Sequence, residues 1–474
     1  MGEVCVKPQY GWTTSARSQG KLHLLRTTDI TAGYVDWDAV PFCKEEPPDK
    51  GKYLLEDGDI VISRAGSVGY SHLMKNPEEA VFASYLIRFR PLIDEGYLAY
   101  FLKSPSYWES ISEKSLGIAL ANVNATKLRQ INVPLPPLPE QPRIVAKIEE
   151  LFTRLDAGVG ALHKIKLQLK RYRQSVLKSA FEGKLTAEWR EAHKGELEPA
   201  SVLLGKIKAE RAKTGKYKEL PPLDTSDLPE LPEGWVWTTI GTLFEVAVGG
   251  TPSRQKPEYW SGNIAWVSSG EVANCRIAGA REYITASGVQ NSNAKPHPPG
   301  TVLLAMIGEG KTRGQAATLD IYAATNQNVA SILCHDSVIP SQYVFLWLIA
   351  RYKETRTKGS GDMQPALNSV RVRLLTIPLC PLPEQHQIAE EIDRCFSVAD
   401  EIEKVVEQSL AQGARLRQSI LKRAFDGNLV PQDPNDEPAE RLLARIKAEK
   451  AGQRADDKTN RGRNRRSLAQ GRLV

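Results

Sequence analysis

Val133-Pro-Leu-Pro-Pro-Leu-Pro-Glu-Gln141 returns 244 residues later as Ile377-Pro-Leu-Cys-Pro-Leu-Pro-Glu-Gln385. The same offset, without a gap, carries Arg171-Tyr-Arg-Gln-Ser-Val-Leu-Lys-Ser-Ala-Phe-Glu-Gly183 onto Arg415-Leu-Arg-Gln-Ser-Ile-Leu-Lys-Arg-Ala-Phe-Asp-Gly427. After a five-residue shift, a third stretch that begins at Glu198 matches one that begins at Glu437. Repetition over so long a period indicates a duplicated structural unit. The 474-residue chain is therefore interpreted as a tandem duplication, with half its length as one unit.

A long helix follows each proline-rich stretch. Between Pro139 and Gly183, and again between Pro383 and Gly427, apolar residues recur at spacings of three and four. Proline suits the first helical turn and glycine suits the position after the last one. We predict helices of about 45 residues over 139–184 and 383–429, each with a coiled-coil seam. The candidate seam residues are Leu155, Leu162, Leu169, Ile402, Val406 and Leu410.

Charge predicts how these helices pair. Residues 140–156 carry four acidic and three basic side chains, whereas 157–184 carry one acidic and seven basic. Residues 384–407 carry eight acidic and two basic side chains, whereas 408–429 carry one acidic and four basic. An antiparallel pair sets each acidic half against a basic half, and a parallel pair does not. We expect an antiparallel pair that holds the two globular regions at opposite ends; the alternative is two separate solvated helices.

The rest of the chain divides around these helices. We predict globular regions at 1–138 and 231–382, a connector with a short helix at 185–230, and a short helix with a basic tail at 430–474. The globular regions share strand-like and aromatic helical stretches but differ in their loops. The expected fold class is α+β: two mixed α/β domains joined by two long antiparallel helices, related by a pseudo-twofold axis. Similar frames with different loops imply two sites of one kind with different specificity.

Composition excludes several classes of protein. The net charge is +7, but residues 451–474 carry +5 of it, so the folded body has only +2 and the tail is expected to be disordered. No apolar run approaches about 18 residues and no signal peptide opens the chain, so we expect a soluble, cytoplasmic protein. Six scattered cysteines, with no Cys-x-x-Cys, favour free thiols over disulfides or structural zinc.

Catalytic motifs are not found. Gly308-Glu-Gly-Lys-Thr312 resembles the end of a phosphate-binding loop, but the pattern requires glycine at position 305, which is Ala305. No Asn-Pro-Pro-[Phe/Tyr] methyltransferase motif occurs, and the histidines form no spaced set of metal ligands. The sequence therefore predicts a chain with no catalytic residues, metal or cofactor of its own.

Polar loop residues are candidates for reading DNA. Arginine and lysine recognise guanine, and asparagine and glutamine recognise adenine, through paired hydrogen bonds in the major groove. Each residue taken alone is also consistent with an ordinary surface charge. The candidates are Lys44, Arg64 and Ser67 in the first globular region, and Arg254, Lys256, Lys311, Arg313, Asn326, Gln327 and Asn328 in the second.

Taken together, the motifs resemble the DNA-specificity subunits of type I restriction-modification enzymes. The proline-rich stretches, the Arg-Gln-Ser-[Val/Ile]-Leu runs, Gly183-Lys-Leu-Thr-Ala-Glu-Trp189 and Leu231-Pro-Glu-Gly-Trp235 carry this resemblance, and Leu-Thr-Ala-x-Trp-Arg is similar to the class A branch. The lead at 231–235 has no counterpart before the first globular region, where Met1-Gly-Glu-Val aligns near Ile240-Gly-Thr-Leu. We therefore expect the first region to lack an opening strand, or its start codon to be misassigned.

The resemblance implies a function for each part of the chain. Each globular region would be a target recognition domain for one half of a bipartite, asymmetric DNA site, and the helix pair would set the unread spacer. Two modification subunits would grip the helices, carry S-adenosylmethionine and methylate adenine N6; two restriction subunits would add ATP- and magnesium-dependent translocation and cleavage. The alternative hypothesis is a coiled-coil scaffold whose globular regions bind protein.

Overall fold

The computed structural model describes residues 1–115, 122–213, 220–273, 276–308, 311–357 and 367–452. The chain forms two compact units. Unit 1 combines Met1–His163 with the chain from Glu407 onward, and unit 2 is Lys164–Val406. The tail that we expected to be disordered lies outside the described residues from 453 onward. Each unit contains part of both long helices. The units therefore do not coincide with the predicted segments, which assign each long helix to a single continuous stretch of sequence.

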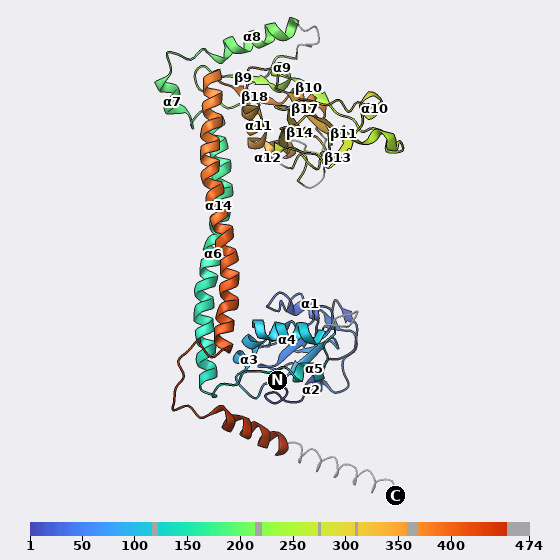
Figure 1. Cartoon of the computed structure of the whole chain (residues 1–474), viewed down its shortest axis with the longest axis vertical. Helices are drawn as coiled ribbons and strands as arrows, with labels where there is room; N and C mark the ends of the chain where they lie inside the picture. Colours follow the sequence, from blue (N-terminus) through green and yellow to red (C-terminus); the bar gives the residue numbers. More distant parts are fainter. Residues whose placement is uncertain (116–121, 214–219, 274–275, 309–310, 358–366, 453–474) are drawn as a thin grey trace. The chain divides into compact units, whose positions relative to one another are not determined.

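Unit 1 contains two small sheets (Figure 1). The first has the order β1-β8-β5-β6 and is antiparallel throughout; its strands are Gln9–Tyr10, Leu86–Phe89, Ile60–Ser63 and Ser71–Leu73. The second has the order β2-β4-β3-β7; its strands are Ala16–Arg17, Phe42–Cys43, His23–Leu25 and Ala80–Phe82. The chain passes from the second sheet to the first through the turn between β7 and β8.

The main core of unit 1 joins segments from distant parts of the sequence. Its helices are α1 (Thr27–Ile30), α2 (Lys50–Tyr53), α3 (Glu95–Phe101), α4 (Pro105–Ser115) and α5 (Ala125–Arg129). Ile60 and Phe89 of the first sheet pack with Tyr97 of α3, Ile148 at the start of the first long helix, and Phe425 at the end of the second. A C-terminal helix over residues 439–452 adds Leu442 and Ile446 to the same core.

Unit 2 repeats this plan with longer strands. A five-stranded sheet has the order β10-β17-β14-β15-β12, with strands Glu245–Val248, Val329–Leu333, Val302–Ala305, Ala316–Leu319 and Arg276–Ile277. A three-stranded sheet has the order β13-β11-β16, with strands Glu282–Ile284, Trp260–Val267 and Ala323–Thr325. A two-stranded sheet pairs β18 (Thr376–Leu379) with β9 (Val236–Thr239).

The helices of unit 2 surround these sheets. They are α7 (Ala187–Ala192), α8 (Ala200–Lys213), α9 (Ile240–Leu243), η1 (Pro257–Tyr259), α10 (Ala286–Gln290), α11 (Ser341–Ala350), α12 (Tyr352–Thr357) and α13 (Ser369–Arg373). The core joins Leu304 of β14, Tyr343 of α11 and Leu203 of α8 to Phe181 and Ile388, one from each long helix. Each unit is therefore completed by turns of both long helices.

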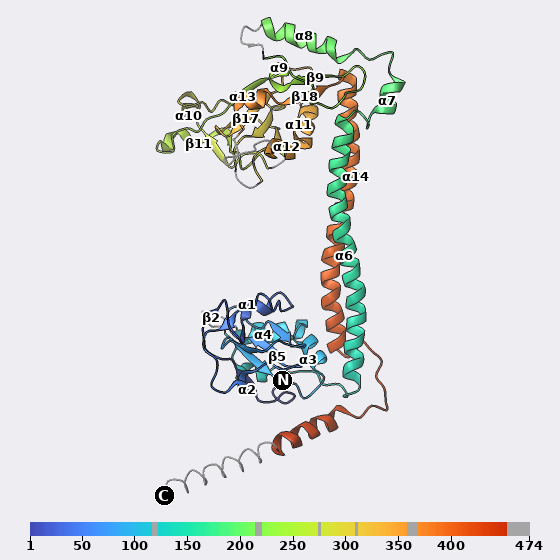
Figure 2. The same ribbon diagram turned by 180° about the vertical axis from the view of Figure 1, so that it is seen from behind.

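The two predicted long helices are present, as α6 (Glu140–Phe181) and α14 (Leu382–Phe425). They lie side by side in both ribbon views (Figures 1 and 2). In unit 1 the acidic half of α6 meets the basic half of α14: Asp156 forms an ion pair with Arg417, whose guanidinium lies 4.2 Å from the Phe152 ring centroid.

The reverse combination occurs in unit 2. Arg173, in the basic half of α6, pairs with Asp400 at 2.5 Å and with Glu403 at 2.8 Å in the acidic half of α14. Lys166 lies 3.9 Å from Glu403. The helices therefore run antiparallel in each unit, and the complementary charge halves face each other as the sequence predicts.

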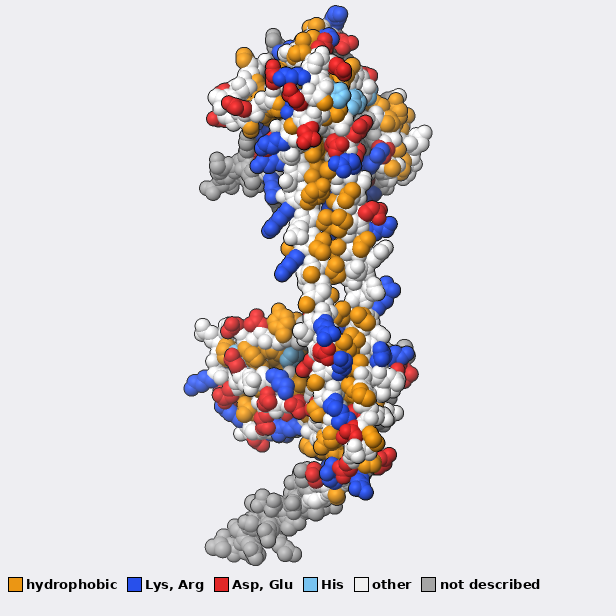
Figure 3. Space-filling model, turned by 90° about the vertical axis from the view of Figure 1, so that its left-hand side faces the viewer, with side chains coloured by type: hydrophobic (Ala, Val, Ile, Leu, Met, Phe, Trp, Pro, Cys, Tyr) orange, Lys and Arg blue, Asp and Glu red, His pale blue; other side chains and the backbone are white. Residues whose placement is uncertain are grey.

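The predicted seam is only partly correct. Leu169 and Val406 are buried, at 8% and 3% exposure, and Leu155, Leu162 and Leu410 are half-buried. Ile402 is 42% exposed and does not belong to the seam. Its neighbours Val398 and Val405 are also exposed, at 54% and 57%, so the described residues of unit 2 do not cover the 398–402–405 stripe. Figure 3 shows hydrophobic side chains exposed along the long helices.

The repeated Pro-Glu-Gln stretch has a structural role at the start of each long helix. In unit 1 the buried Gln141 accepts a hydrogen bond from the Asp94 amide at 2.9 Å and donates to the Pro136 carbonyl at 3.1 Å. In unit 2 the buried Gln385 donates to the Cys380 carbonyl at 2.8 Å, but its Oε1 has no partner. The glutamine thus ties the helix to the preceding proline-rich stretch.

The glutamate before it anchors the connector in unit 2. Glu384 is fully buried; its Oε1 accepts from Arg190 at 2.7 Å and from Thr186 at 2.8 Å, and its Oε2 accepts from the indole of Trp235 at 2.8 Å. A buried carboxylate requires such partners. The Leu-Thr-Ala-x-Trp-Arg and Leu-Pro-Glu-Gly-Trp motifs therefore converge on one side chain.

The main-chain contacts at the start of the two units can be compared directly. In unit 2, β9 pairs with β18, and the Ile240 amide that follows β9 donates to the Leu375 carbonyl at 2.9 Å. In unit 1 the Met1 amino group occupies the position of the Ile240 amide and donates to the Ile131 carbonyl. Residues 132–135, which correspond to β18, form no strand.

Candidate functional site

Glycines hold a loop of unit 2 against the turn that joins its three-stranded sheet to its five-stranded sheet. A Cβ on Gly249 would lie 1.9 Å from the Thr325 carbonyl oxygen, so only glycine allows this approach. The Gly250 amide donates to the same oxygen at 2.9 Å, and the Trp266 indole donates to the Gly250 carbonyl at 2.9 Å. These contacts bring loop 249–256, which carries Arg254 and Lys256, to the same edge of unit 2 as turn 325–329, which carries the candidate amide side chains.

Gln327 is the exposed amide at this edge. Its Oε1 accepts a hydrogen bond from Thr251 at 2.6 Å, which fixes the carboxamide while the side chain remains open to solvent. Asn328 is half-buried beside it. Asn326 differs: it is 8% exposed, and its Oδ1 accepts from the Asn328 amide at 3.1 Å, so it stabilises the turn from a buried position. The burial of Asn326 therefore argues against its predicted role in reading DNA.

Arg254 is held by its neighbours. Its guanidinium lies 3.6 Å from the Trp260 ring centroid and 5.3 Å from that of Trp266, and it forms a two-point ion pair with Glu282. The hydrogen bond from Arg254 lowers the pKa of the Glu282 carboxyl, which therefore remains charged. The Arg254 guanidinium is thus held in place, and its two terminal nitrogens already donate to the Glu282 carboxylate. Lys256 is also engaged, with its Nζ 3.1 Å from the Tyr259 hydroxyl.

Lys311 and Arg313 belong to the turn that follows β14. The Lys311 side chain is exposed, and its carbonyl accepts a hydrogen bond from the Tyr352 hydroxyl at 2.6 Å. Arg313 is half-buried. Positions 309 and 310 of this motif lie outside the described residues. The turn is therefore fixed to α12, while the ammonium of Lys311 faces solvent.

In unit 1, Arg64 follows strand β5 and is half-buried. Its guanidinium lies 5.2 Å from the Tyr10 ring centroid, and its Nε is buried without a partner. Ser67 and Lys44 are exposed. Ser67 is held through its carbonyl, which accepts from the Ser63 hydroxyl, and the Lys44 amide donates to the Ser15 carbonyl at 2.9 Å. Lys44 comes from the other sheet of unit 1.

The sequence missed the exposed aromatics. Tyr85 is 59% exposed, Tyr34 67% and Tyr322 68%. Tyrosine is common in cores as well as on binding surfaces, so residue type alone gives no signal here. Tyr85 lies in the turn that corresponds to 325–329. The Arg64 amide donates to the Tyr85 carbonyl at 2.9 Å, but the two residues are far apart in the sequence, so the sequence does not show that they are neighbours.

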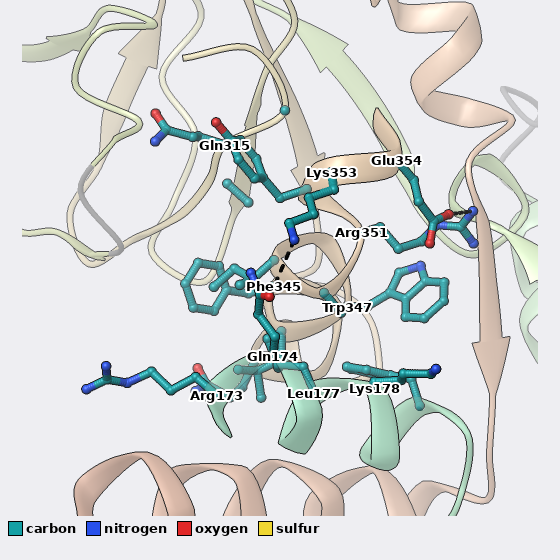
Figure 4. Close-up of a pocket in the computed structure, with 18 of the residues that line it drawn as sticks. Arg173, Gln174, Leu177, Lys178, Gln315, Phe345, Trp347, Arg351, Lys353 and Glu354 are labelled. Carbon is teal, nitrogen blue, oxygen red and sulfur yellow. Dashed lines mark hydrogen bonds and ion pairs between the residues drawn. The ribbon is translucent and has the colours of Figure 1, made fainter. Parts of the chain in front are cut away.

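A groove of about 1300 Å³ lies within unit 2, between α6, the α11–α12 hairpin and residues 227–231. Figure 4 shows Lys353 of α12 extending to Gln174 of α6, at 3.5 Å. Two of the basic side chains on its walls form ion pairs: Arg173 with α14 carboxylates and Arg351 with Glu354. None of the candidate reading residues lines it. The groove is therefore a structural junction between the helices and the globular domain.

Other kinds of site are not found in the part of the chain that the structure describes. No group of three or more histidine, cysteine or acidic residues there could hold a metal ion. No described helix is long and apolar enough to cross a membrane. Five described cysteines are free, buried thiols.

Comparison with known proteins fits this duplicated architecture. The family model of the type I restriction modification DNA specificity domain matches twice, over residues 9–167 and 232–412. The chain belongs to this specificity-domain family. Each match spans one globular region and most of the long helix that follows it, which is the repeat that the proline-rich stretches predict.

Curated relatives of this specificity-domain protein match along most of its length. It is 26% identical to the type I restriction enzyme EcoDI specificity subunit of Escherichia coli, over 91% of this chain and 94% of the relative. It is also 26% identical to the StySPI specificity subunit of Salmonella potsdam, over 91% of this chain and 89% of the relative.

Solved structures share the fold. The HsdS subunit from Thermoanaerobacter tengcongensis superposes with a TM-score of 0.54 at 17% identity, covering 90% of this chain and 95% of that chain. A chain from a study of complex assembly and conformational transition of the type I R-M system gives a TM-score of 0.62 at 18% identity, covering 90% and 96%. The two specificity domains and two long helices are thus a shared architecture.

Proposed function

We propose that this chain is the DNA-specificity subunit of a type I restriction-modification complex. Each globular domain reads one half of a bipartite, asymmetric DNA site, and the antiparallel helices set the length of the unread spacer. The observation that carries the proposal is the duplicated unit itself: two domains on one frame, each followed by a helix of more than 40 residues, with different polar residues at the corresponding edges.

The proposed division of labour assigns no chemistry to this chain. Two modification subunits would dock on the helices and would supply S-adenosylmethionine and adenine-N6 methylation. Two restriction subunits would supply ATP- and magnesium-dependent translocation and cleavage. The exposed stripe of Val398, Ile402 and Val405 gives such a partner an apolar face on α14. A complex that acts on chromosomal DNA would work in the cytoplasm.

The decisive experiment is methylation of a random-sequence DNA library by the full chain with its modification partner. We expect methylated sites with two fixed half-sites at a constant spacing. Methylation without two half-sites, or no methylation by a well-folded complex, would contradict the proposal and favour the alternative of a scaffold with protein-binding domains.

The spacer is tested separately. Deleting four residues from each long helix removes about one helical turn, roughly 6 Å. The deletions are made at matched positions so that the antiparallel pairing is kept. We expect a shorter spacer with unchanged half-sites; a spacer of the original length would refute the role of the helices as a ruler.

A further inference from the structure

The turn between β7 and β8 in unit 1 is structurally equivalent to the turn between β16 and β17 in unit 2. In unit 1 the Arg64 amide donates to the Tyr85 carbonyl at 2.9 Å. In unit 2 the Met306 amide donates to the Asn328 carbonyl at 2.8 Å. Both donors directly follow an inner strand, which is β5 of the β1-β8-β5-β6 sheet in unit 1 and β14 of the five-stranded sheet in unit 2. Position 64 therefore corresponds to 306, and position 85 to 328.

The start of each turn confirms this correspondence. The Ala83 amide donates to the Leu25 carbonyl at 2.8 Å, and the Asn326 amide donates to the Val267 carbonyl at 3.0 Å. Leu25 is the last residue of β3, which pairs in parallel with β7, the strand before the turn in unit 1. Val267 is the last residue of β11, which pairs in parallel with β16, the strand before the turn in unit 2. The turns 82–86 and 325–329 have the same length, so Ser84 corresponds to Gln327.

The glycine loop aligns in the same way. A Cβ on Gly11 would lie 2.3 Å from the Phe82 carbonyl oxygen, as one on Gly249 would lie 1.9 Å from that of Thr325. Position 10 therefore corresponds to 248. Four corresponding positions thus surround one edge in each unit, and their residues differ: Tyr10, Arg64, Ser84 and Tyr85 in unit 1, and Val248, Met306, Gln327 and Asn328 in unit 2.

Arg64 is positioned at this edge without a partner for its donors. The Tyr10 ring beneath it is fixed, because the Tyr10 hydroxyl accepts from the Ala125 amide at 3.0 Å. Among the described residues the guanidinium has no hydrogen bond or ion pair, in contrast to Arg254, which is paired with Glu282. The exposed ring of Tyr85 lies in the adjoining turn. Because the Nε is buried, the Nη donors of this guanidinium are the ones that remain for a ligand.

The chemistry at the two edges is different. A guanidinium only donates, which matches the two acceptors of guanine in the major groove. A carboxamide both donates and accepts, which matches adenine. Gln327 is the exposed carboxamide, and Thr251 orients it through its Oε1.

We propose that this edge is the base-reading position of each domain: Arg64, backed by Tyr10 and flanked by Tyr85, reads a guanine in the first half-site, and Gln327 reads an adenine in the second. The inference rests on the proposed function and assigns its reading to particular positions. Specificity differs between the domains because a shared backbone frame presents different side chains at the same four positions.

The test uses the full chain with its modification partner on a random-sequence DNA library. In Arg64→Gln we expect the preference for one guanine in the first half-site to fall by about 5- to 150-fold, with the second half-site unchanged. In Gln327→Arg one adenine of the second half-site should be replaced by guanine. Lys75→Gln, which removes one positive charge from an exposed position at the end of the β5–β6 pair opposite Arg64, is the matched control and should leave both half-sites unchanged.

The outcomes separate the two proposals. Unchanged half-sites in both Arg64→Gln and Gln327→Arg would overturn this inference while leaving the specificity-subunit function in place. Wild-type methylation without two half-sites would overturn both. If Arg64→Gln abolishes methylation at every site, Arg64→Lys decides: a retained site with weakened guanine preference supports the inference, and a retained site with unaltered preference overturns it.

Discussion

Replacing Pro340 with aspartate should stabilise unit 2, because it restores two interactions that unit 1 has at the corresponding position. Asp94 and Pro340 are the N-caps of α3 and α11, with φ and ψ of −53° and 121° against −60° and 129°. The Asp94 amide donates to Gln141, and its carboxylate accepts from the Tyr97 amide at 2.8 Å. Proline has no N–H, which explains why Oε1 of Gln385 has no partner.

The expected gain follows from three contributions. A carboxylate N-cap is worth about 1 kcal/mol. A donor for a buried, unsatisfied acceptor is worth about 1–3 kcal/mol. Removing proline costs about 0.4–1 kcal/mol, because the unfolded chain gains freedom. The net stabilisation is about 2 kcal/mol, which corresponds to roughly 4–8 °C in the Tm of a unit of this size.

The assay is calorimetric unfolding of the full chain, with hydrogen exchange at the α11 amides to identify the transition of unit 2. Pro340→Ala is the control that restores the donor without the cap, and about half the gain is expected. Asp94→Pro should destabilise unit 1 by a similar amount. If neither Pro340→Asp nor Pro340→Ala exceeds the stability of the parent chain, the explanation of the Gln385 acceptor is wrong.

Three further predictions concern unit 1. Lys450→Met removes hydrogen bonds from the C-terminal helix to three main-chain carbonyls between Gly2 and Cys5. Calorimetry should show the free energy of unfolding of unit 1 lowered by about 1–3 kcal/mol and that of unit 2 unchanged. Burial lowers the pKa of His72 from 6.5 to about 4, so protonation favours unfolding: stability should fall from pH 6.5 towards 4, and His72→Gln should reduce this slope in urea titrations. Gly413→Ala places a Cβ 3.4 Å from Val159, an ordinary contact, and should stabilise the helix pair by about 1 kcal/mol in urea unfolding; destabilisation would contradict that packing.

Several features of the fold could be predicted because they depend on local sequence or on charge. The period of apolar residues gives α6 and α14, whose observed bounds fall within three or four residues of the predicted ones. The separation of acidic and basic halves gives their antiparallel pairing. Ile402 shows the limit of this reasoning: several apolar positions share a helical period, and only the partner helix determines which of them it covers.

Which candidate residues are exposed and held in place for reading DNA could not be predicted from the sequence. Arg64, Asn326 and Gln327 all look like polar loop residues in the sequence. In the structure Asn326 is turned inward to hold its own turn, Gln327 is fixed by Thr251, and Arg64 lies on the Tyr10 ring. Tyr85 was overlooked because an exposed tyrosine and a buried one read alike.

By itself, the sequence determined that this protein is duplicated, that each half carries a long helix, and that the helices oppose each other, because repetition, periodicity and charge are properties of the chain. Only the tertiary structure decided which positions correspond between the two domains. That correspondence is set by main-chain hydrogen bonds, such as Arg64 to Tyr85 and Met306 to Asn328, and these are independent of side-chain identity. Two diverged loops can therefore share one frame while their residues retain no similarity.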